Sequence, residues 1–420
     1  MIQLSCNVLQ KGRSNNMLEK SFKIYNREVA NRVVFQPMEG CDGTFDGKPD
    51  ELTARRYMRF AEGIPGIIWF EATAVCHEGR ANPRQLYMNE KNVESFKNLV
   101  SEIKQKCFEK AGYKPIIIVQ LTHSGRYSKP DGSPAPIVAY RNELWEKGKE
   151  NQPFNVATDE YLSTIPSMYS KAAKLAAEAG FDGIDVKCCH GYLFNELLSA
   201  YDREGNYGGS FENRTRLYFD CIDEVKKAVG EKLFVTTRLN ACDCFDYPYG
   251  FGVNDKNEID LSETKKIIEI LREKGIGLVN ITIGNPYLIP HINRPYLASS
   301  PEDGNIGMAR VYRVTKEICE SFPDIDFIVS ALSFEGENSA DYAEKLLNEN
   351  VGAFAGFGRM TFAYPDFYKD WVEKGKLDKK KVCIKCGKCS ELMRAGTVSG
   401  CVIRDSGVYM PYYEKYVLKK

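Results

Sequence analysis

The sequence has 420 residues, with 57 Lys plus Arg and 57 Asp plus Glu, so its formal net charge is zero. Proteins that bind nucleic-acid phosphates normally carry a basic excess or a basic stripe, and this sequence has neither. Hydrophobic residues make up 43% of the chain, which argues against disorder, and no apolar window is long enough for a signal peptide or a membrane span. We therefore expect a folded cytoplasmic protein that binds neither nucleic acid nor a membrane.

Eight short runs of apolar and β-branched residues predict strands, at 32–37, 66–74, 115–122, 183–187, 233–240, 278–283, 326–331 and 352–358. Amphipathic helical patterns lie between several of them, for example 161–179, followed by Gly180, and 261–274, followed by Gly275. Eight such alternations predict an α/β fold, a (β/α)8 TIM barrel. An open doubly wound sheet is the alternative, weakened because no G-x-G-x-x-G follows the first strand.

Two long connections, 125–158 and 284–307, are rich in Pro, Gly and charged residues. Both follow strand carboxyl ends, where barrel enzymes place their sites. We expect residues 1–372 to form the barrel, with an N-terminal extension and these two insertions, and residues 373–420 to form a separate cysteine-rich segment.

The 14 cysteines divide into two groups. Ten are scattered between Cys6 and Cys319, and we expect most to be small buried apolar residues. The other four form a C-x2-C-x2-C-x11-C pattern in a short C-terminal segment whose apolar content is too small for an independent core: Cys383, Cys386, Cys389 and Cys401. A bound metal would supply what that core lacks, and the spacing suits tetrahedral zinc and a [4Fe–4S] cluster equally well.

Polar side chains stand at or just beyond the carboxyl ends of nearly all predicted strands, the last of them preceded by Gly358: Glu39, Gln120, His123, Lys187, His190, Tyr192, Arg238, Asn285, Ser330 and Arg359. Amide, guanidinium, imidazole and phenol groups that converge on one face suit a polar heterocyclic ligand. The small residues near the seventh and eighth strands suit a phosphate on that ligand, because backbone N–H groups can approach an anion closely there.

Several segments in order resemble the Old Yellow Enzyme family of FMN-dependent reductases: 31–38 (NRVVFQPM), 120–126 (QLTHSGR), 190–193 (HGYL), 207–214 (YGGSFENR), 358–359 (GR) and 363–366 (AYPD). The resemblance covers roughly residues 24–401. The cysteine tail is similar to that of the iron–sulfur branch, which includes 2,4-dienoyl-CoA reductase and trimethylamine dehydrogenase. Relatives in that branch often continue into a C-terminal FAD/NAD(P)H domain, which we expect this chain to lack.

The resemblance implies a role for each matching residue. Pro37, Met38, Glu39 and Ala72 would lie against the flavin, Gln120 would bond its pyrimidine edge and Arg238 would lie near N1 and the C2 carbonyl. The phosphate would be held by Ser330, Ala331, Leu332, Gly358 and Arg359. Lys187 and His190 would bind a substrate carbonyl or carboxylate, and Tyr192 would donate a proton. The flavin context favours [4Fe–4S] over zinc in the tail, because zinc cannot change its oxidation state.

Two positions depart from the family pattern. Lys187 replaces the first residue of the family's His-x-x-His or His-x-x-Asn, and Glu39 stands where many relatives have Thr or Cys. A carboxylate beside the flavin would destabilise its reduced form, so we expect Glu39 to pair with Lys187 or Arg238 or to be protonated.

The implied activity is reduction of an activated C=C bond by hydride transfer from FMN N5. The substrate would be an α,β-unsaturated carbonyl or carboxyl compound, with a bulky one such as a steroid among the candidates. Electrons would come from NAD(P)H directly, or through the cluster from a reduced carrier such as a ferredoxin or flavoprotein. The alternatives are an oxidative dehydrogenase or demethylase of the trimethylamine dehydrogenase type, and a non-catalytic barrel with a zinc tail. The sequence leaves a homo-oligomer open.

Overall fold

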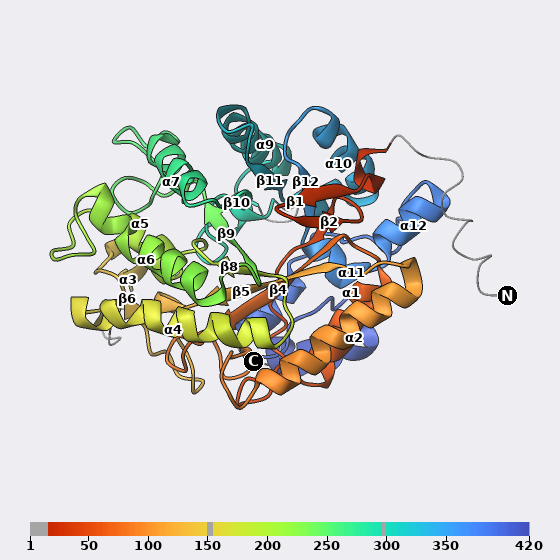
Figure 1. The fold of residues 1–420 in the computed structure, drawn as a ribbon, viewed down its shortest axis with the longest axis horizontal. Coiled ribbons are helices and arrows are strands. Elements are labelled where there is room, and N and C mark those ends of the chain that lie inside the picture. Colours follow the sequence, from red (N-terminus) through yellow and green to blue (C-terminus); the bar gives the residue numbers. More distant parts are fainter. Residues whose placement is uncertain (1–15, 149–153, 296–299, 420) are drawn as a thin grey trace.

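The computed structural model describes residues 16–148, 154–295 and 300–419. Eight parallel strands close into a barrel in the order β3-β4-β5-β8-β9-β10-β11-β12 (Figure 1). This confirms the predicted (β/α)8 fold and all eight predicted strands, which have these bounds: β3 (Val33–Phe35), β4 (Ile67–Ala74), β5 (Ile116–Thr122), β8 (Gly183–Val186), β9 (Phe234–Asn240), β10 (Leu278–Thr282), β11 (Asp326–Val329) and β12 (Phe354–Phe357).

Helices surround the barrel (Figure 1). The predicted helices appear as α4 and α7. After each of them the chain turns towards the next strand through a glycine with positive φ, +83° at Gly180 and +74° at Gly275. The helices within and around the barrel are η1 (Met17–Glu19), α1 (Glu51–Glu62), α2 (Val93–Ala111), η2 (Gly125–Tyr127), α3 (Glu143–Glu146), α4 (Asp159–Glu178), α5 (Leu193–Leu198), α6 (Phe211–Val229), α7 (Ser262–Glu273), α8 (Pro290–Asn293), α9 (Gly304–Ser321), η3 (Leu332–Asn338), α10 (Ser339–Asn348), α11 (Arg359–Ala363) and α12 (Phe367–Lys374).

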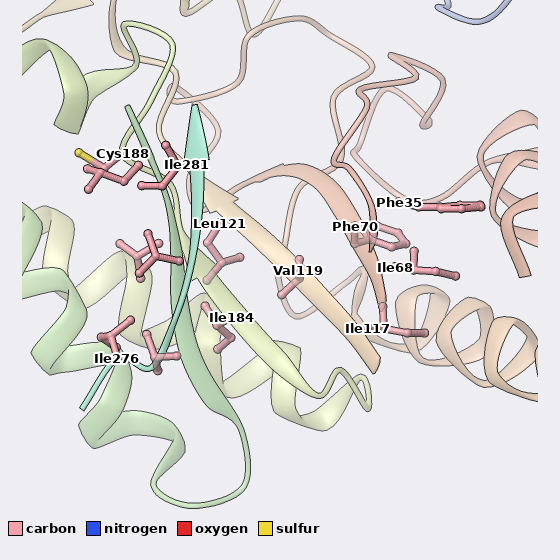
Figure 2. Packing of buried hydrophobic residues seen from close by; sticks show 14 of the residues in the cluster. Phe35, Ile68, Phe70, Ile117, Val119, Leu121, Ile184, Cys188, Ile276 and Ile281 are labelled. Carbon is pink, nitrogen blue, oxygen red and sulfur yellow. The ribbon is translucent and has the colours of Figure 1, made fainter. Parts of the chain in front are cut away.

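In seven of the eight barrel strands, neighbouring residues enter two different apolar layers, whereas β8 contributes to only one of them. Ile68, Ile117 and Val119 belong to the large layer between strands and helices, part of which Figure 2 shows. Their neighbours Ile67 and Ile116 belong to a second, smaller cluster. These seven strands are thus apolar on both faces, which is why they read as continuous hydrophobic runs in the sequence.

A hairpin that the sequence reading missed packs onto the smaller cluster. It consists of β1 (Phe22–Ile24) and β2 (Arg27–Val29), paired antiparallel. Ile24 and Val29 of the hairpin are buried in one cluster with residues from seven of the barrel strands. The amino end of the barrel is therefore filled by side chains, and space for a ligand is left at the carboxyl end.

The predicted insertions are irregular and lie at the carboxyl end of the barrel. The first contains two very short parallel strands that the sequence did not indicate, β6 (Ile137–Val138) and β7 (Asn155–Val156). Residues 149–153 and 296–299 of the two insertions, and Cys6, lie outside the described residues. Of the nine other scattered cysteines, seven are buried and two, Cys244 and Cys319, are half-buried, as expected.

The cysteine-rich segment ends in α13 (Lys388–Arg394), α14 (Ser406–Tyr413) and the π-helical turn η4 (Glu414–Leu418). It has a small apolar cluster of its own, built around Leu392, Val402 and Tyr409, against which Leu52 of α1 packs. Asp405 pairs with Arg55 and Arg59 of α1 at 2.7 and 2.6 Å. The segment is thus attached to the barrel through α1. None of the helices in the described ranges combines the length and the apolar character needed to cross a membrane.

Candidate active site

A cavity of about 160 Å³ opens at the carboxyl end of the barrel. It collects twelve of the fourteen residues predicted to contact flavin or substrate: Pro37, Met38, Glu39, Gln120, Lys187, His190, Tyr192, Arg238, Ser330, Ala331, Gly358 and Arg359. The other two are not on its wall. Ala72 is fully buried opposite Gln120 in the β4–β5 register, and Leu332 lies in the apolar layer between strands and helices.

Asp185 of β8 orients two of the cavity's side chains from beneath. Its carboxylate accepts hydrogen bonds from Gln120 Nε2 at 2.6 Å, Trp69 Nε1 at 2.7 Å and the Arg238 backbone N–H at 2.7 Å. Burial raises the Asp185 pKa to about 6, although these donors oppose the rise. The arrangement fixes the Gln120 amide and the start of the Arg238 side chain at the cavity wall.

Arg238 is half-buried on this wall, and its buried Nε leaves part of its hydrogen-bonding capacity unused. Among the described residues its Nε has no partner. Burial lowers the pKa of the Arg238 guanidinium from its ordinary value. A buried, unpaired guanidinium N–H needs an acceptor, and a flavin N1 and C2 carbonyl would provide one. The residues present therefore fit FMN at this position.

Glu39, Lys187 and Tyr192 form a compact group on the same wall. The Lys187 ammonium lies 3.8 Å from a Glu39 carboxylate oxygen and 3.5 Å from the centre of the Tyr192 ring. The Tyr192 hydroxyl donates to Glu39 at 3.1 Å and lies 3.1 Å from the Tyr287 hydroxyl. Glu39 was expected to pair with Lys187 or Arg238 or to be protonated, and in the structure it pairs with Lys187.

The pKa values in this group shift in opposite directions. Burial lowers the Lys187 pKa, and the Glu39 carboxylate opposes that change. Burial, followed by the charge of Glu39, raises the Tyr192 pKa well above its ordinary value. Tyr192 is thus a neutral phenol at physiological pH, with a proton available to donate.

His190 also lines the cavity and has a left-handed backbone conformation with φ +66°. Its Nε2 is 3.3 Å from Asn293 Nδ2. Burial, reinforced by the Arg238 charge, lowers the His190 pKa well below its ordinary value. The imidazole is therefore neutral at physiological pH and can offer a hydrogen bond without a charge.

The predicted phosphate residues meet at the ends of β11 and β12. Gln36 donates from Nε2 to Ser330 Oγ at 3.1 Å and to Asn280 Oδ1 at 3.2 Å. Ala331 has φ +68°, and Arg359 Nη2 donates to the Pro295 carbonyl at 3.1 Å. A tight turn beside two small residues and a guanidinium suits an anion.

Residues 18–277 match the model of the NADH:flavin oxidoreductase / NADH oxidase family. The chain belongs to this family. It is 32% identical to an NADPH dehydrogenase of Geobacillus sp. (strain WCH70) over 71% of this chain and 84% of that protein. An NADH oxidase of Thermoanaerobacter brockii is 27% identical over 95% of this chain and 58% of its own length. The fold also matches a 2-naphthoyl-CoA reductase complex with a TM-score of 0.75 and 20% identity, over 92% of this chain and 56% of that one.

Membership confirms the resemblance to Old Yellow Enzymes and makes the chain a flavin-dependent NAD(P)H oxidoreductase. In this family member the C-terminal segment also contributes to the cavity, which sequence reasoning missed. Cys389, Ser390, Met393 and Ser399 line it. Arg294, from the second insertion, donates to the Ser390 hydroxyl. The only sequence signal for this segment was its cysteine spacing, which says nothing about where it packs.

Three of the four tail cysteines are close enough for their charges to interact. Burial raises the pKa of Cys389, and the neighbouring Cys383 adds to the rise. The Cys401 pKa is about 11, raised by burial and, more weakly, by Cys383 and Cys389. Cys386 is exposed, and no three His, Cys, Asp or Glu side chains of the described chain are arranged as a metal site. The four thiols are suitable donors for a metal, but their positions in the structure do not form a metal site.

Proposed function

We propose that this oxidoreductase reduces an activated C=C bond in an α,β-unsaturated carbonyl or carboxyl compound. The observation that carries the proposal is the Tyr192 hydroxyl on the cavity wall. It is bonded to Glu39 and Tyr287 at 3.1 Å each, and its pKa is raised well above the ordinary value by burial and Glu39. A phenol kept neutral in this way can protonate the α carbon as negative charge develops there.

Bound FMN would supply the hydride that the β carbon receives, with NAD(P)H as the source of electrons. Gln120 and Arg238 would hold the flavin ring, while Ser330, Gly358 and Arg359 would hold its phosphate. The reaction is then balanced by one hydride and the one proton from Tyr192, which solvent replaces.

The charge of the cavity favours reduction of a carbonyl compound over oxidation of an amine. Lys187 and Arg294 line the cavity in addition to Arg238 and Arg359, the two arginines that would hold the flavin, and Glu39 is the only carboxylate among the described residues that do. Cations repel a protonated amine, whereas they stabilise the negative charge that develops on a conjugated carbonyl oxygen. The oxidative alternative is therefore second.

The phenol role is tested by turnover under anaerobic conditions with NADPH and cyclohex-2-enone. We expect Tyr192→Phe to lower kcat for enone reduction by about 10²- to 10⁴-fold, the usual contribution of a general acid. Reduction of the flavin by NADPH in the same variant should be nearly unchanged. The control is Tyr169→Phe, which removes a buried hydroxyl outside the cavity. A Tyr192→Phe enzyme with the wild-type rate would rule out this role, and absence of enone and enoate turnover in the wild type would rule out the function.

For the tail, we propose a [4Fe–4S] cluster held by Cys383, Cys386, Cys389 and Cys401. Its support is the thiol donor set, the approach of three of the thiols and a backbone N–H of Arg404 that donates to Cys401 Sγ at 3.3 Å. Cys386 would have to move inward, which its exposed position permits. Metal analysis of anaerobically purified protein decides the matter: about four iron per chain is expected, and zinc without iron would refute the cluster and favour a structural site.

A further inference from the structure

A second and larger cavity, of about 440 Å³, lies beside the first. The two share Glu39, Tyr287 and Met393 in their walls. A substrate whose reacting atoms lie near Tyr192 and Glu39 can therefore extend past these shared residues into the second cavity. The proposed chemistry uses none of the other residues that line it.

One wall of the second cavity is aromatic. Tyr127 stacks on Tyr287 with ring centres 3.9 Å apart, and Trp145 meets the Tyr127 ring edge-on at 5.7 Å. Phe154 adds a further ring. A rigid set of rings of this kind suits a flat apolar body such as an aromatic or fused ring system.

The second cavity also carries positive charge that the Glu39 carboxylate in its wall does not neutralise, because Glu39 pairs with Lys187. Three cations line it, and only Arg126 is neutralised, by Glu196 and by Glu146 at 3.5 Å. In the described part of the chain the half-buried Lys129 ammonium has no hydrogen-bond or ion-pair partner. Arg394 donates to the Pro286 carbonyl at 3.2 Å and has no carboxylate partner there.

The two unpaired cations come from segments that meet at this cavity. Lys129 lies in the first insertion and Arg394 ends α13 of the tail. A Cβ at Gly396, two residues after Arg394, would lie 3.9 Å from Lys129 Nζ. The Lys129 ammonium therefore reaches the turn that follows Arg394.

We propose that the second cavity binds the distal part of the substrate, an aromatic or fused apolar ring bearing an anionic group, and that Lys129 and Arg394 bind the anion. This assignment rests on the proposed function, which places the reacting double bond in the first cavity. It identifies the substrate class as bulky anionic enones or enoates. A carboxylate and a phosphate share the chemistry that both cations recognise.

Equilibrium binding to the flavin-loaded protein tests the anion site without turnover. The probes are 4-(3-oxobutyl)benzoate, the matching phenyl phosphate and the neutral methyl ester, all of which lack a reducible double bond. We expect the anions to bind about tenfold or more tightly than the ester, and the advantage to fall as salt is added. The tighter of the two anions identifies the group that the site prefers.

The variants Lys129→Met and Arg394→Met should each reduce the anion's affinity by about tenfold and leave the ester's unchanged. The matched control is Lys147→Met, which removes an exposed charge from the same insertion outside the cavity wall. Equal affinities for anion and ester in the wild type, or variants that weaken both equally, would overturn the proposal.

Turnover separates this proposal from the function on which it rests. The substrates are the α,β-unsaturated counterpart of the benzoate probe and its methyl ester. We expect the acid to have a lower KM than the ester, and we expect Lys129→Met to remove that difference in KM with little change in kcat. Reduction of both compounds with equal KM would refute the anion site and leave the reductase intact. Charge-dependent binding without reduction of either compound would refute the reductase and leave the anion site intact.

Discussion

Glu39→Gln is the change that most directly tests the electrostatics of the candidate site. In the wild type the Glu39 carboxylate lies 3.8 Å from the Lys187 ammonium, and both side chains are largely buried. With an effective dielectric constant of roughly 20, two unit charges at this distance interact by about 4 kcal/mol, equivalent to about 3 pKa units. Gln keeps an acceptor for the Tyr192 hydroxyl but removes the charge.

The sign of the effect follows from the two neighbours. The Glu39 charge raises the pKa of Lys187 against its burial and adds to the rise at Tyr192. Without it, both groups lose their protons at a lower pH. We therefore expect the alkaline limb of the pH profile of kcat/KM to move down by about 1 to 3 pKa units.

The measurement is kcat/KM for NADPH-dependent enone reduction from about pH 6 to about pH 10, a range into which the alkaline limb of the variant should move. Glu143→Gln, which removes an exposed carboxylate outside the cavity, should leave the profile unchanged. An alkaline limb that stays in place in Glu39→Gln would show that neither Lys187 nor Tyr192 depends on this carboxylate, and the reasoning would be refuted.

Three further changes test the supporting structure. Burial raises the pKa of the Asp185 carboxyl to about 6, above its value of about 3.9 in the unfolded chain. Its contribution to the free energy of unfolding is therefore full below about pH 4 and falls by about 3 kcal/mol as the pH rises through about 6. Urea unfolding of Asp185→Asn should lack this decrease of the unfolding free energy with pH. A Cβ at Gly356 would collide with the Gln36 side chain, so Gly356→Ala should destabilise the fold by about 1–3 kcal/mol in thermal unfolding, and an unchanged Tm would contradict the packing. Asp405→Asn removes the ion pairs to two arginines of α1 and should speed proteolysis of the tail while the barrel stays folded; equal cleavage rates would mean that these pairs do not hold the tail.

The fold was predictable because most barrel strands are apolar on both faces and amphipathic helices lie between several of them. The N-terminal hairpin was not, because its strands are only three residues long and its turn begins at Tyr25 with φ +51°, a conformation that Gly or Asn usually provides. The pairing depends on burial of Ile24 and Val29 against the barrel, which is tertiary and leaves no local signal.

The candidate site was largely predictable for a related reason. In a parallel barrel all strand carboxyl ends meet at one face, so polar residues at those ends converge whatever their separation in sequence. Tyr287, Asn293 and Arg294 lie in the second insertion, a loop whose aromatic and Pro-rich sequence suggested a pocket roof. No role could be predicted for each residue there, because no periodicity constrains the side chains. Ala72 and Leu332 were assigned to the flavin site by resemblance alone. A resemblance gives the position of a residue in a motif, but it does not show whether the side chain faces the cavity.

The tail affects the site through the backbone, independently of any metal. The Ser399 N–H donates to the Gly40 carbonyl at 2.6 Å, and the Gly40 N–H donates to Glu71 at 2.9 Å. Glu71 in turn accepts from Arg56 at 2.6 Å in the buried interior. The residue next to Glu39 is thus held from the tail on one side and from β4 and α1 on the other. Any change that detaches the tail must break the Ser399–Gly40 hydrogen bond, which lies next to the carboxylate that raises the pKa values of Lys187 and Tyr192.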